Sequence, residues 1–213
     1  MIFKDRQEAG EKLAKLIPEK TVIISLLRGG VVVGNEIAKR RHSLHLPLSV
    51  AKISAPYNPE LAIGSVCFNS VYLNFNFIKT LDLDNETVNK QIKLAKKKNI
   101  SYTKRFSLNQ SLYKRKLKNK KVVIVDDGIA TGSTLKASWL FIKSCQPNKI
   151  YLAVPVAPTD FQPSGFDKVF ILSFEPFFSA VSQFYESFPQ IEDDQVKTFF
   201  PNLFRKKKTG RHR

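Results

Sequence analysis

Two carboxylates stand directly after an apolar run in the stretch VVIVDDGIATGST, residues 122 to 134. Asp126 and Asp127 are followed by Gly128, which permits a tight turn, and then by small and hydroxyl-bearing residues. Carboxylates accept hydrogen bonds from paired hydroxyls such as those of a ribose. Backbone N–H groups and hydroxyls at the start of a helix bind a phosphate. These residue types, in this order, predict a site for a sugar phosphate.

The loop behind the carboxylates has the composition of a phosphate cradle. Gly132 lets a phosphate approach the backbone, and Thr131, Ser133 and Thr134 supply hydroxyls. A Walker A loop is excluded, because it needs four residues between its glycines and a Lys before the Ser or Thr, and no G-x-G-x-x-G dinucleotide pattern is present. For Asp-Asp-Gly alone, an ordinary turn followed by a Ser/Thr helix cap would explain the residues. The full thirteen-residue run favours the ligand loop.

Apolar runs that alternate with helical patterns must position these residues. Strands are expected at 21–27, 46–53, 65–68, 71–77, 121–125, 149–156 and 168–174. Helices are expected at 5–17, 31–40, 85–98, 133–145 and 178–185, with polar and poorly patterned chain from 99 to 119. This alternation predicts an α/β fold with a mostly parallel sheet and right-handed crossovers.

Two unusual loops fall at the carboxyl ends of expected strands, where ligands of such sheets bind. Residues 122–125 have no polar face, so their strand should be central and covered on both sides. The other loop is Arg28-Gly29-Gly30, after the strand of 21–27. Taken alone, that second loop indicates only a Gly-Gly turn with a surface Arg.

Length and composition are those of a globular protein. The 213 residues, 43% of them hydrophobic, suit one domain, predicted at 1–204 and followed by a basic tail at 205–213. The apolar runs are too short to span a membrane, and the first ten residues contain no signal core. Cys67 and Cys145 are far apart in sequence and are expected to be buried thiols. A cytoplasmic protein is predicted.

The net charge of +17 is confined to two places. Residues 90 to 121 hold thirteen Lys and Arg and no acid, and the tail 205–213 adds six more cations. The first segment indicates either a solvated helix face or a groove for nucleic acid, and the tail either a solvated end or a nucleic-acid contact. His42 and His45 have no Cys or carboxylate nearby in sequence and are not expected to bind a metal.

The stretch VVIVDDGIATGST closely resembles the phosphoribosyl-pyrophosphate (PRPP) signature of type I phosphoribosyltransferases. The stretches DRQEAGEKLAKLI, LLRGGVVVGNEIA, AKISAPYNPELAIGSV, YLAVPVAP and FYESFPQIEDDQV are similar to a stand-alone bacterial branch of the same superfamily. The resemblance covers roughly residues 3 to 200. It implies a Rossmann-like sheet with a small hood and a mobile loop, and it says little about the acceptor.

The resemblance also implies roles for individual residues. Asp126 and Asp127 would bind the ribose hydroxyls, and Arg28 would meet the leaving pyrophosphate. The remaining residues implied to bind PRPP are Gly29, Gly30, Lys52, Gly128, Ile129, Ala130, Thr131, Gly132, Ser133 and Thr134. Ile129 to Thr134 would hold the 5′-phosphate chiefly through backbone N–H groups.

The basic segment precedes the signature strand, where the family has its mobile hood loop. Lys104 and Arg105 are the cations expected to stabilise charge on the leaving group while the closed loop excludes water. Lys52 follows a strand and could reach the pyrophosphate, or it is an exposed strand-end lysine.

The function expected from this resemblance is transfer of a phosphoribosyl group to a nitrogenous acceptor, such as a nucleobase, with release of pyrophosphate. Mg²⁺ is the expected cofactor, held by PRPP and water with no direct protein ligand. The alternative is a PRPP-sensing regulator that contacts nucleic acid through its basic segment or tail. A homodimer is consistent with the resemblance, and no membrane partner is expected.

Overall fold

A computed structural model describes residues 2–130 and 132–204 of the chain. The strands are β1 (Thr21–Leu26), β2 (His45–Leu48), β3 (Ala51–Ala55), β4 (Asn58–Cys67), β5 (Ser70–Leu73), β6 (Lys121–Val125), β7 (Lys149–Pro158) and β8 (Lys168–Glu175). The helices are α1 (Arg6–Ala14), α2 (Gly30–Arg40), α3 (Phe75–Thr80), α4 (Asn85–Arg105), α5 (Gln110–Leu117), α6 (Ser133–Ser144), α7 (Asp193–Phe199) and α8 (Pro201–Phe204), with a 3₁₀ turn η1 (Val181–Phe184).

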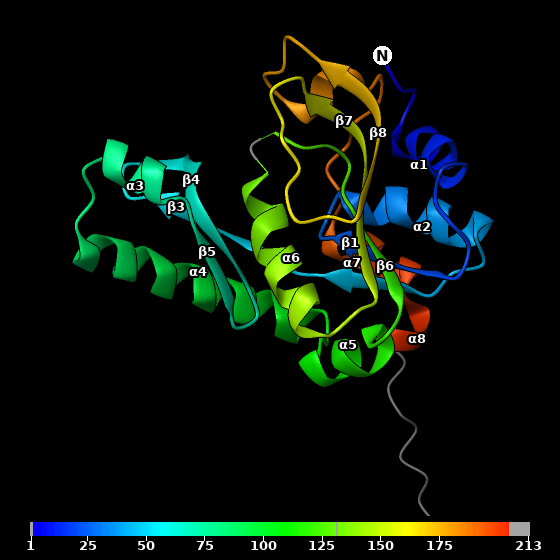
Figure 1. The fold of residues 1–213 in the computed structure, drawn as a ribbon, viewed down its shortest axis with the longest axis horizontal. Coiled ribbons are helices and arrows are strands. Elements are labelled where there is room, and N and C mark those ends of the chain that lie inside the picture. Colours follow the sequence, from blue (N-terminus) through cyan, green and yellow to red (C-terminus); the bar gives the residue numbers. More distant parts are fainter. Residues whose placement is uncertain (1, 131, 205–213) are drawn as a thin grey trace, which may run out of the picture.

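The main sheet is parallel, with strand order β2-β1-β6-β7-β8 (Figure 1). Strands β1 and β6 are neighbours in register, and Ser25 pairs with Val125 near their carboxyl ends. The two loops singled out in the sequence therefore leave the same edge of the sheet side by side. The predicted α/β fold with a mostly parallel sheet is confirmed.

Helices cover both faces of the central strand β6. Val122 and Ile124 belong to a buried cluster that includes residues of α5 and α6. Val123 and Val125, whose side chains alternate to the other face, pack in a cluster with residues of α1 and α2. A strand without a polar face needs such double cover, as the sequence predicted.

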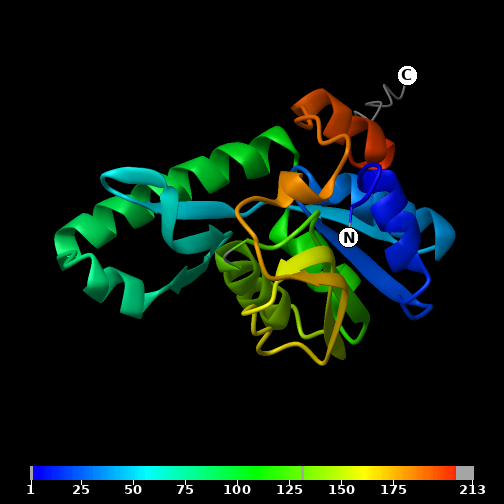
Figure 2. The ribbon, with the colours of Figure 1, turned by 90° about the horizontal axis from the view of Figure 1, so that it is seen from above.

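A second, antiparallel sheet of order β3-β4-β5 forms an arm together with α3 and α4 (Figures 1 and 2). Its core joins β3 and β4 to α4 through residues such as Ile53, Ile63 and Val88. The Ser65 hydroxyl on β4 donates to the carbonyl of Ser133, 2.6 Å away. The arm is thus attached to the first residue of α6, directly behind the predicted phosphate loop.

The single strand expected at 46–53 is in fact two strands in different sheets. β2 pairs with β1 in the main sheet, whereas β3 pairs with β4 in the arm. Ser49 and Val50 lie between them and are buried or partly buried. Ser49 is the one polar residue in this break and apolar residues flank it, so the sequence pattern predicts one strand.

Residues 71–77 and 99–119 also differ from expectation. β5 ends at Leu73, and α3 begins after Asn74, whose side chain accepts from the N–H of Phe77 at 3.1 Å. α4 continues to Arg105, and α5 follows it. The part of the basic segment expected as poorly patterned chain, 99–119, is therefore mainly helical, because sparse apolar residues such as Tyr113 and Leu117 suffice to bury one face of α5.

The beginning of the chain pairs with its C-terminal part. Phe3 bridges to Tyr185, and its N–H donates to the carbonyl of Phe184 at 2.8 Å. Both cysteines are buried and free, as expected. Among the described helices, none is long and apolar enough to cross a membrane. The tail prediction for 205–213 lies outside the described residues.

Candidate functional site

The loops after β1 and β6 touch each other, which explains the glycines in Arg28-Gly29-Gly30. A Cβ atom at Gly29 would overlap the carboxylate oxygen Oδ2 of Asp127. A Cβ at Gly30 would lie 2.9 Å from Oδ1 of Asp126, closer than side chains tolerate. The predicted pyrophosphate loop and the predicted ribose carboxylates therefore form one continuous surface.

The two carboxylates have different partners. Asp126 accepts from the backbone N–H of Asp127 at 3.0 Å. Asp127 accepts from Arg6 Nε at 2.7 Å, and its carbonyl accepts from the Tyr185 hydroxyl at 2.6 Å. Arg6 was not among the residues singled out in the sequence, since it lies 121 positions before its partner.

Burial makes both carboxylates weak acids. Burial raises the pKa of Asp126 well above its ordinary value, and the neighbouring charge of Asp127 raises it further. Burial also raises the pKa of Asp127, but the Arg6 guanidinium opposes this rise. The pair is thus asymmetric, and Asp127 is the carboxylate more readily ionised.

The phosphate loop turns into α6 at Gly132. This residue has φ +69°, in the left-handed region, and a Cβ there would lie 3.0 Å from Cε2 of Phe161. The N–H of Ile129 donates to the carbonyl of Val156 at 3.0 Å, so Ile129 is anchored to β7 rather than turned toward a ligand. The expectation that its N–H joins the cradle stays a prediction. Thr131 lies outside the described residues.

Two adjoining cavities lie over these loops. The first, of about 360 Å³, is lined by Arg28, Lys52 and Lys98 together with Tyr102 and Thr134. The second, of about 200 Å³, is lined by Lys52, Asp126, Gly128, Ile129, Ala130, Gly132, Thr134, Leu135 and Val181. Lys52 and Thr134 border both cavities. One end is therefore cationic and suits phosphates, and the other presents a carboxylate and the loop before α6.

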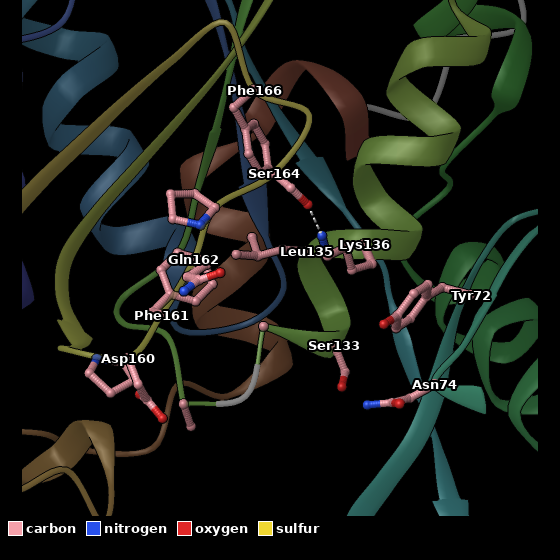
Figure 3. Close-up of a pocket in the computed structure, with 14 residues that line it drawn as sticks. Tyr72, Asn74, Ser133, Leu135, Lys136, Asp160, Phe161, Gln162, Ser164 and Phe166 are labelled. Atoms are coloured by element: carbon pink, nitrogen blue, oxygen red, sulfur yellow. Dashed lines mark hydrogen bonds between the residues drawn. The ribbon is translucent and has the colours of Figure 1, made fainter. Parts of the chain in front are cut away.

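A third cavity, of about 390 Å³, lies on the other side of the phosphate loop (Figure 3). Figure 3 shows Phe161 and Gln162 of the β7–β8 connection across from Tyr72 and Asn74 of the arm, with Ser133 and the start of α6 between them. Lys136 donates a hydrogen bond to the Ser164 hydroxyl across one end. This cavity shares Ala130, Gly132 and Leu135 with the second one.

Two of the three predicted catalytic cations, Arg28 and Arg105, meet at the start of α7. Arg28 lies 3.5 Å from carboxylate oxygens of both Glu192 and Asp193, and Arg105 forms an ion pair with Asp193. Arg28 follows a cis peptide bond after Leu27. Lys104 is exposed and does not border either of the two site cavities described above.

The structure thus brings together the residues predicted around both loops, along with Lys52. Sequence reasoning missed Lys98 and Tyr102, which stand four residues apart and therefore on one face of α4. It also missed Asp193 and Glu192, at the start of a helix that was not expected.

Comparisons with known proteins agree on one family. Residues 4–185 match the model of the phosphoribosyl transferase domain. Two Mycobacterium tuberculosis proteins, each named as a phosphoribosyl transferase, are 35% identical to the chain over 216 residues. The match covers 96% of this chain and 47% of each relative, so the chain spans about half the length of these curated relatives. The crystal structure of TT1426 from Thermus thermophilus superposes with a TM-score of 0.71 at 29% identity, covering 93% of this chain and 97% of that one.

Proposed function

The chain belongs to the phosphoribosyl transferase domain family, and from that premise we propose that it transfers the phosphoribosyl group of PRPP to a nitrogenous acceptor of the nucleobase class. The C1–oxygen bond of PRPP breaks, and its electron pair leaves with pyrophosphate. A ring nitrogen of the acceptor bonds to C1 and loses its proton. The observation that carries this proposal is the pair of adjoining cavities of opposite character at the ends of β1 and β6.

The carboxylate end suits the sugar. A ribose diol can donate to the oxygens of Asp126 and Asp127, and such donation favours their ionised forms against the effect of burial. The start of α6 offers N–H groups without helical partners to the 5′-phosphate. With Ile129 anchored to β7, the cradle is expected to consist of Ala130, Gly132, Ser133 and Thr134, together with Thr131.

The cationic end suits the leaving group. Negative charge accumulates on pyrophosphate as the C1–oxygen bond breaks, and Arg28, Lys52 and Lys98 would stabilise it. Because this charge grows as the bond breaks, the cations stabilise the transition state more than the bound substrate. Lys104 and Arg105 were the cations expected from the sequence to stabilise the leaving pyrophosphate. We now prefer Lys98 to Lys104 for this role.

Mg²⁺ is proposed to arrive on the substrate. Among the described residues, no group of three or more His, Cys, Asp or Glu side chains lies close enough together to hold a metal ion. The carboxylates Asp126 and Asp127 offer hard oxygen donors at this edge of the sheet, which fits an ion that keeps water and substrate phosphates as ligands. When bound, Mg²⁺ would neutralise part of the charge on pyrophosphate.

The deciding experiment measures pyrophosphate release from PRPP and Mg²⁺, with and without single nucleobases. Release that depends on one base supports the transferase and names its acceptor. Release without any base indicates hydrolysis of PRPP. No release from a sample that binds PRPP would refute the transferase and favour a PRPP-binding regulator.

A pair of glycine variants tests where the phosphate binds. Gly132→Val should weaken PRPP binding by roughly tenfold or more, because a side chain at φ +69° strains the loop and contacts Phe161. Gly165→Val is the matched control, since Gly165 also has a positive φ (+90°) and contacts Trp139 instead. Equal affinities of both variants in calorimetric titration would contradict the loop assignment.

A regulator that contacts nucleic acid is the second candidate, and one observation favours it. All thirteen cations from Lys90 to Lys121 are exposed. With residues about 100° apart around a helix, Lys90, Lys93, Lys97 and Lys104 fall within a stripe about 60° wide. That stripe lies opposite the packed residues of α4, including Val88 and Ala95.

Replacing these four lysines by Gln tests the second candidate. If α4 binds nucleic acid, the affinity for a labelled RNA or DNA should fall, and the dependence of binding on salt should become less steep. PRPP binding should stay unchanged. Equal nucleic-acid binding by the variant and the unmodified protein would exclude α4 as the contact.

A further inference from the structure

Arg6 lies in an unusual place for a cation. It begins α1, directly after the N-cap Asp5, and its side chain is only 7% exposed. Its Nε donates to Oδ2 of Asp127 at 2.7 Å, and its Nη1 donates to the carbonyl of Pro189 at 2.8 Å. The guanidinium stacks on the ring of Phe188, with 3.6 Å between Cζ and the ring centroid.

Three separate segments therefore meet around the Arg6–Asp127 pair. α1 supplies Arg6, the chain after η1 supplies Tyr185, Phe188 and Pro189, and the loop after β6 supplies Asp127. The pairing of Phe3 with Tyr185 holds the first two segments together. Each group that contacts Asp127 is thereby fixed by another element.

Arg6 also borders the predicted pyrophosphate loop. A Cβ at Gly29 would lie 3.2 Å from Nη2 of Arg6 while overlapping Oδ2 of Asp127. The guanidinium is thus packed between the carboxylate and the backbone of Gly29. Its Nε and Nη1 donors are already bonded to Asp127 and Pro189, so these donors are not available to a ligand.

A surface ion pair would have little influence on the carboxylate, but this pair is buried. An oxygen bonded to a fixed guanidinium holds the carboxylate plane in one orientation. A buried cation close by also favours the ionised form of Asp127, which is the form that accepts from two hydroxyls. Without Arg6, the effect of burial on the pKa of Asp127 would lose its largest opposing influence.

We propose that Arg6 is a positioning residue of the ribose site, which holds the Asp127 carboxylate oriented and ionised for a ligand diol without touching the ligand. The inference rests on the proposed function, since it takes PRPP as the ligand. It adds α1 and the segment 185–189 to the site.

The test compares Arg6→Gln and Arg6→Lys with Arg40→Gln. Arg40 pairs with Glu11 between α2 and α1, so this control removes the same charge from an exposed pair. Calorimetric titration measures the affinity for PRPP and, separately, for inorganic pyrophosphate between pH 5 and 9. Thermal unfolding reports whether each variant is folded.

Arg6→Gln should weaken PRPP binding by about 10- to 100-fold, the usual effect of losing a partner that orients a ligating group. Pyrophosphate affinity, which depends on Arg28 and the lysines, should change less than threefold. The acidic limb of the PRPP pH profile should move to higher pH, because Asp127 loses the cation that opposes its burial. Asp126 and Tyr185 also face Asp127, but they remain in every variant.

Arg6→Lys should recover part of the PRPP affinity, since it keeps the charge but not the planar geometry. If Arg6→Gln does not fold, Arg6→Lys carries the test through the same ratio of PRPP to pyrophosphate affinity. Arg40→Gln should behave like the unmodified protein.

Different results would overturn the positioning role of Arg6 and the proposed function. PRPP affinity and pH profile unchanged in Arg6→Gln would overturn the positioning role and leave the proposed function intact. Equal losses for PRPP and pyrophosphate in a folded variant would show a merely structural role. Failure of the unmodified protein to bind PRPP would overturn the proposed function, and the positioning role with it.

Discussion

Burial and a single ion pair give Asp126 and Asp127 different protonation behaviour. Burial, and after it the charge of Asp127, raises the pKa of Asp126. Burial also raises the pKa of Asp127, but Arg6 partly offsets this rise. A site that requires two adjacent carboxylates therefore costs stability in the absence of ligand. Such losses of stability are common at functional sites, where activity requires polar groups that do not stabilise the fold.

Replacing Asp126 tests this cost directly. A carboxyl group whose pKa is raised by folding destabilises the protein once the pH exceeds its unfolded value of about 3.9. Asp126→Asn should therefore raise the melting temperature at pH 7, and the gain should disappear as the pH falls toward about 3.9. The same substitution should weaken PRPP binding, because one acceptor for the diol is lost. Thermal unfolding across the acidic and neutral pH range measures the first effect.

Asp194→Asn is the control for that experiment. Asp194 is exposed, and its bond from Lys197 lowers its pKa, so its removal should bring no gain at pH 7. A lower melting temperature for Asp126→Asn than for the unmodified protein at pH 7 would mean that ionised Asp126 makes contacts that outweigh its burial.

At the residue level, the sequence predicted what is local. The carboxylates, the glycines and Arg28 follow strands directly, so an apolar run and its end suffice to place them. Arg6 is different, because its partner lies 121 positions away and only the tertiary fold brings them together. Lys98 was hidden for another reason, since a lysine among twelve other cations of one segment carries no distinguishing signal.

Among the elements, helix α7 has the most direct bearing on the site. Its first residue, Asp193, lies 3.5 Å from Nη1 of Arg28 and forms an ion pair with Arg105. A carboxylate in this place competes with any anion for Arg28. α7 is held against α2 by Ile191 and Val196, so the competing group is fixed rather than mobile.

Asp193→Asn should therefore bind inorganic pyrophosphate more tightly than the unmodified protein. We expect the affinity for pyrophosphate to rise about threefold to tenfold, which is the effect expected from removing one exposed or half-exposed charge pair. Asp194→Asn removes the same charge from the same turn of α7 and serves as the matched control. Equal pyrophosphate affinities for the two variants, measured by titration, would exclude competition by Asp193.

The elements of the main sheet were predictable because β1, β6, β7 and β8 are apolar runs bounded by polar chain. The arm was less predictable. β5 and α3 are short and contain no fully buried residue, and the break after β2 is marked by the single polar residue Ser49. In the C-terminal part, Phe177 is 87% exposed, whereas Phe184 and Tyr185 are buried.

At the scale of the whole molecule, a buried amide joins the arm to the main sheet. Asn99 on α4 donates to the carbonyl of Ser49 at 2.9 Å and accepts from the N–H of Phe68 at 2.9 Å. Ser49 follows β2 of the main sheet, and Phe68 lies in the turn between β4 and β5 of the arm. One side chain thus satisfies backbone groups of both parts.

Asn99→Ala should cost about 1–3 kcal/mol of stability, the range for leaving buried backbone partners unsatisfied. Hydrogen exchange should become faster in the turn after β4 and in α4, and less so in β6. Asn89→Ala is the control, because Asn89 is an exposed residue of the same helix. Uniform acceleration across both sheets would indicate global destabilisation instead of loosening of the arm.

The contacts of Arg6 have a consequence for the order in which the protein is made. Arg6 leaves the ribosome first, and Asp127 follows 121 positions later. Pro189, which holds the other side of the guanidinium, follows 183 positions after Arg6. Both faces of the main sheet can begin to collapse before then, because α1 to β6 are already present. The carboxylate nevertheless acquires its fixed partner only after Pro189 has been made. An interrupted translation product can therefore contain all of the signature loop and still lack an ordered ribose site.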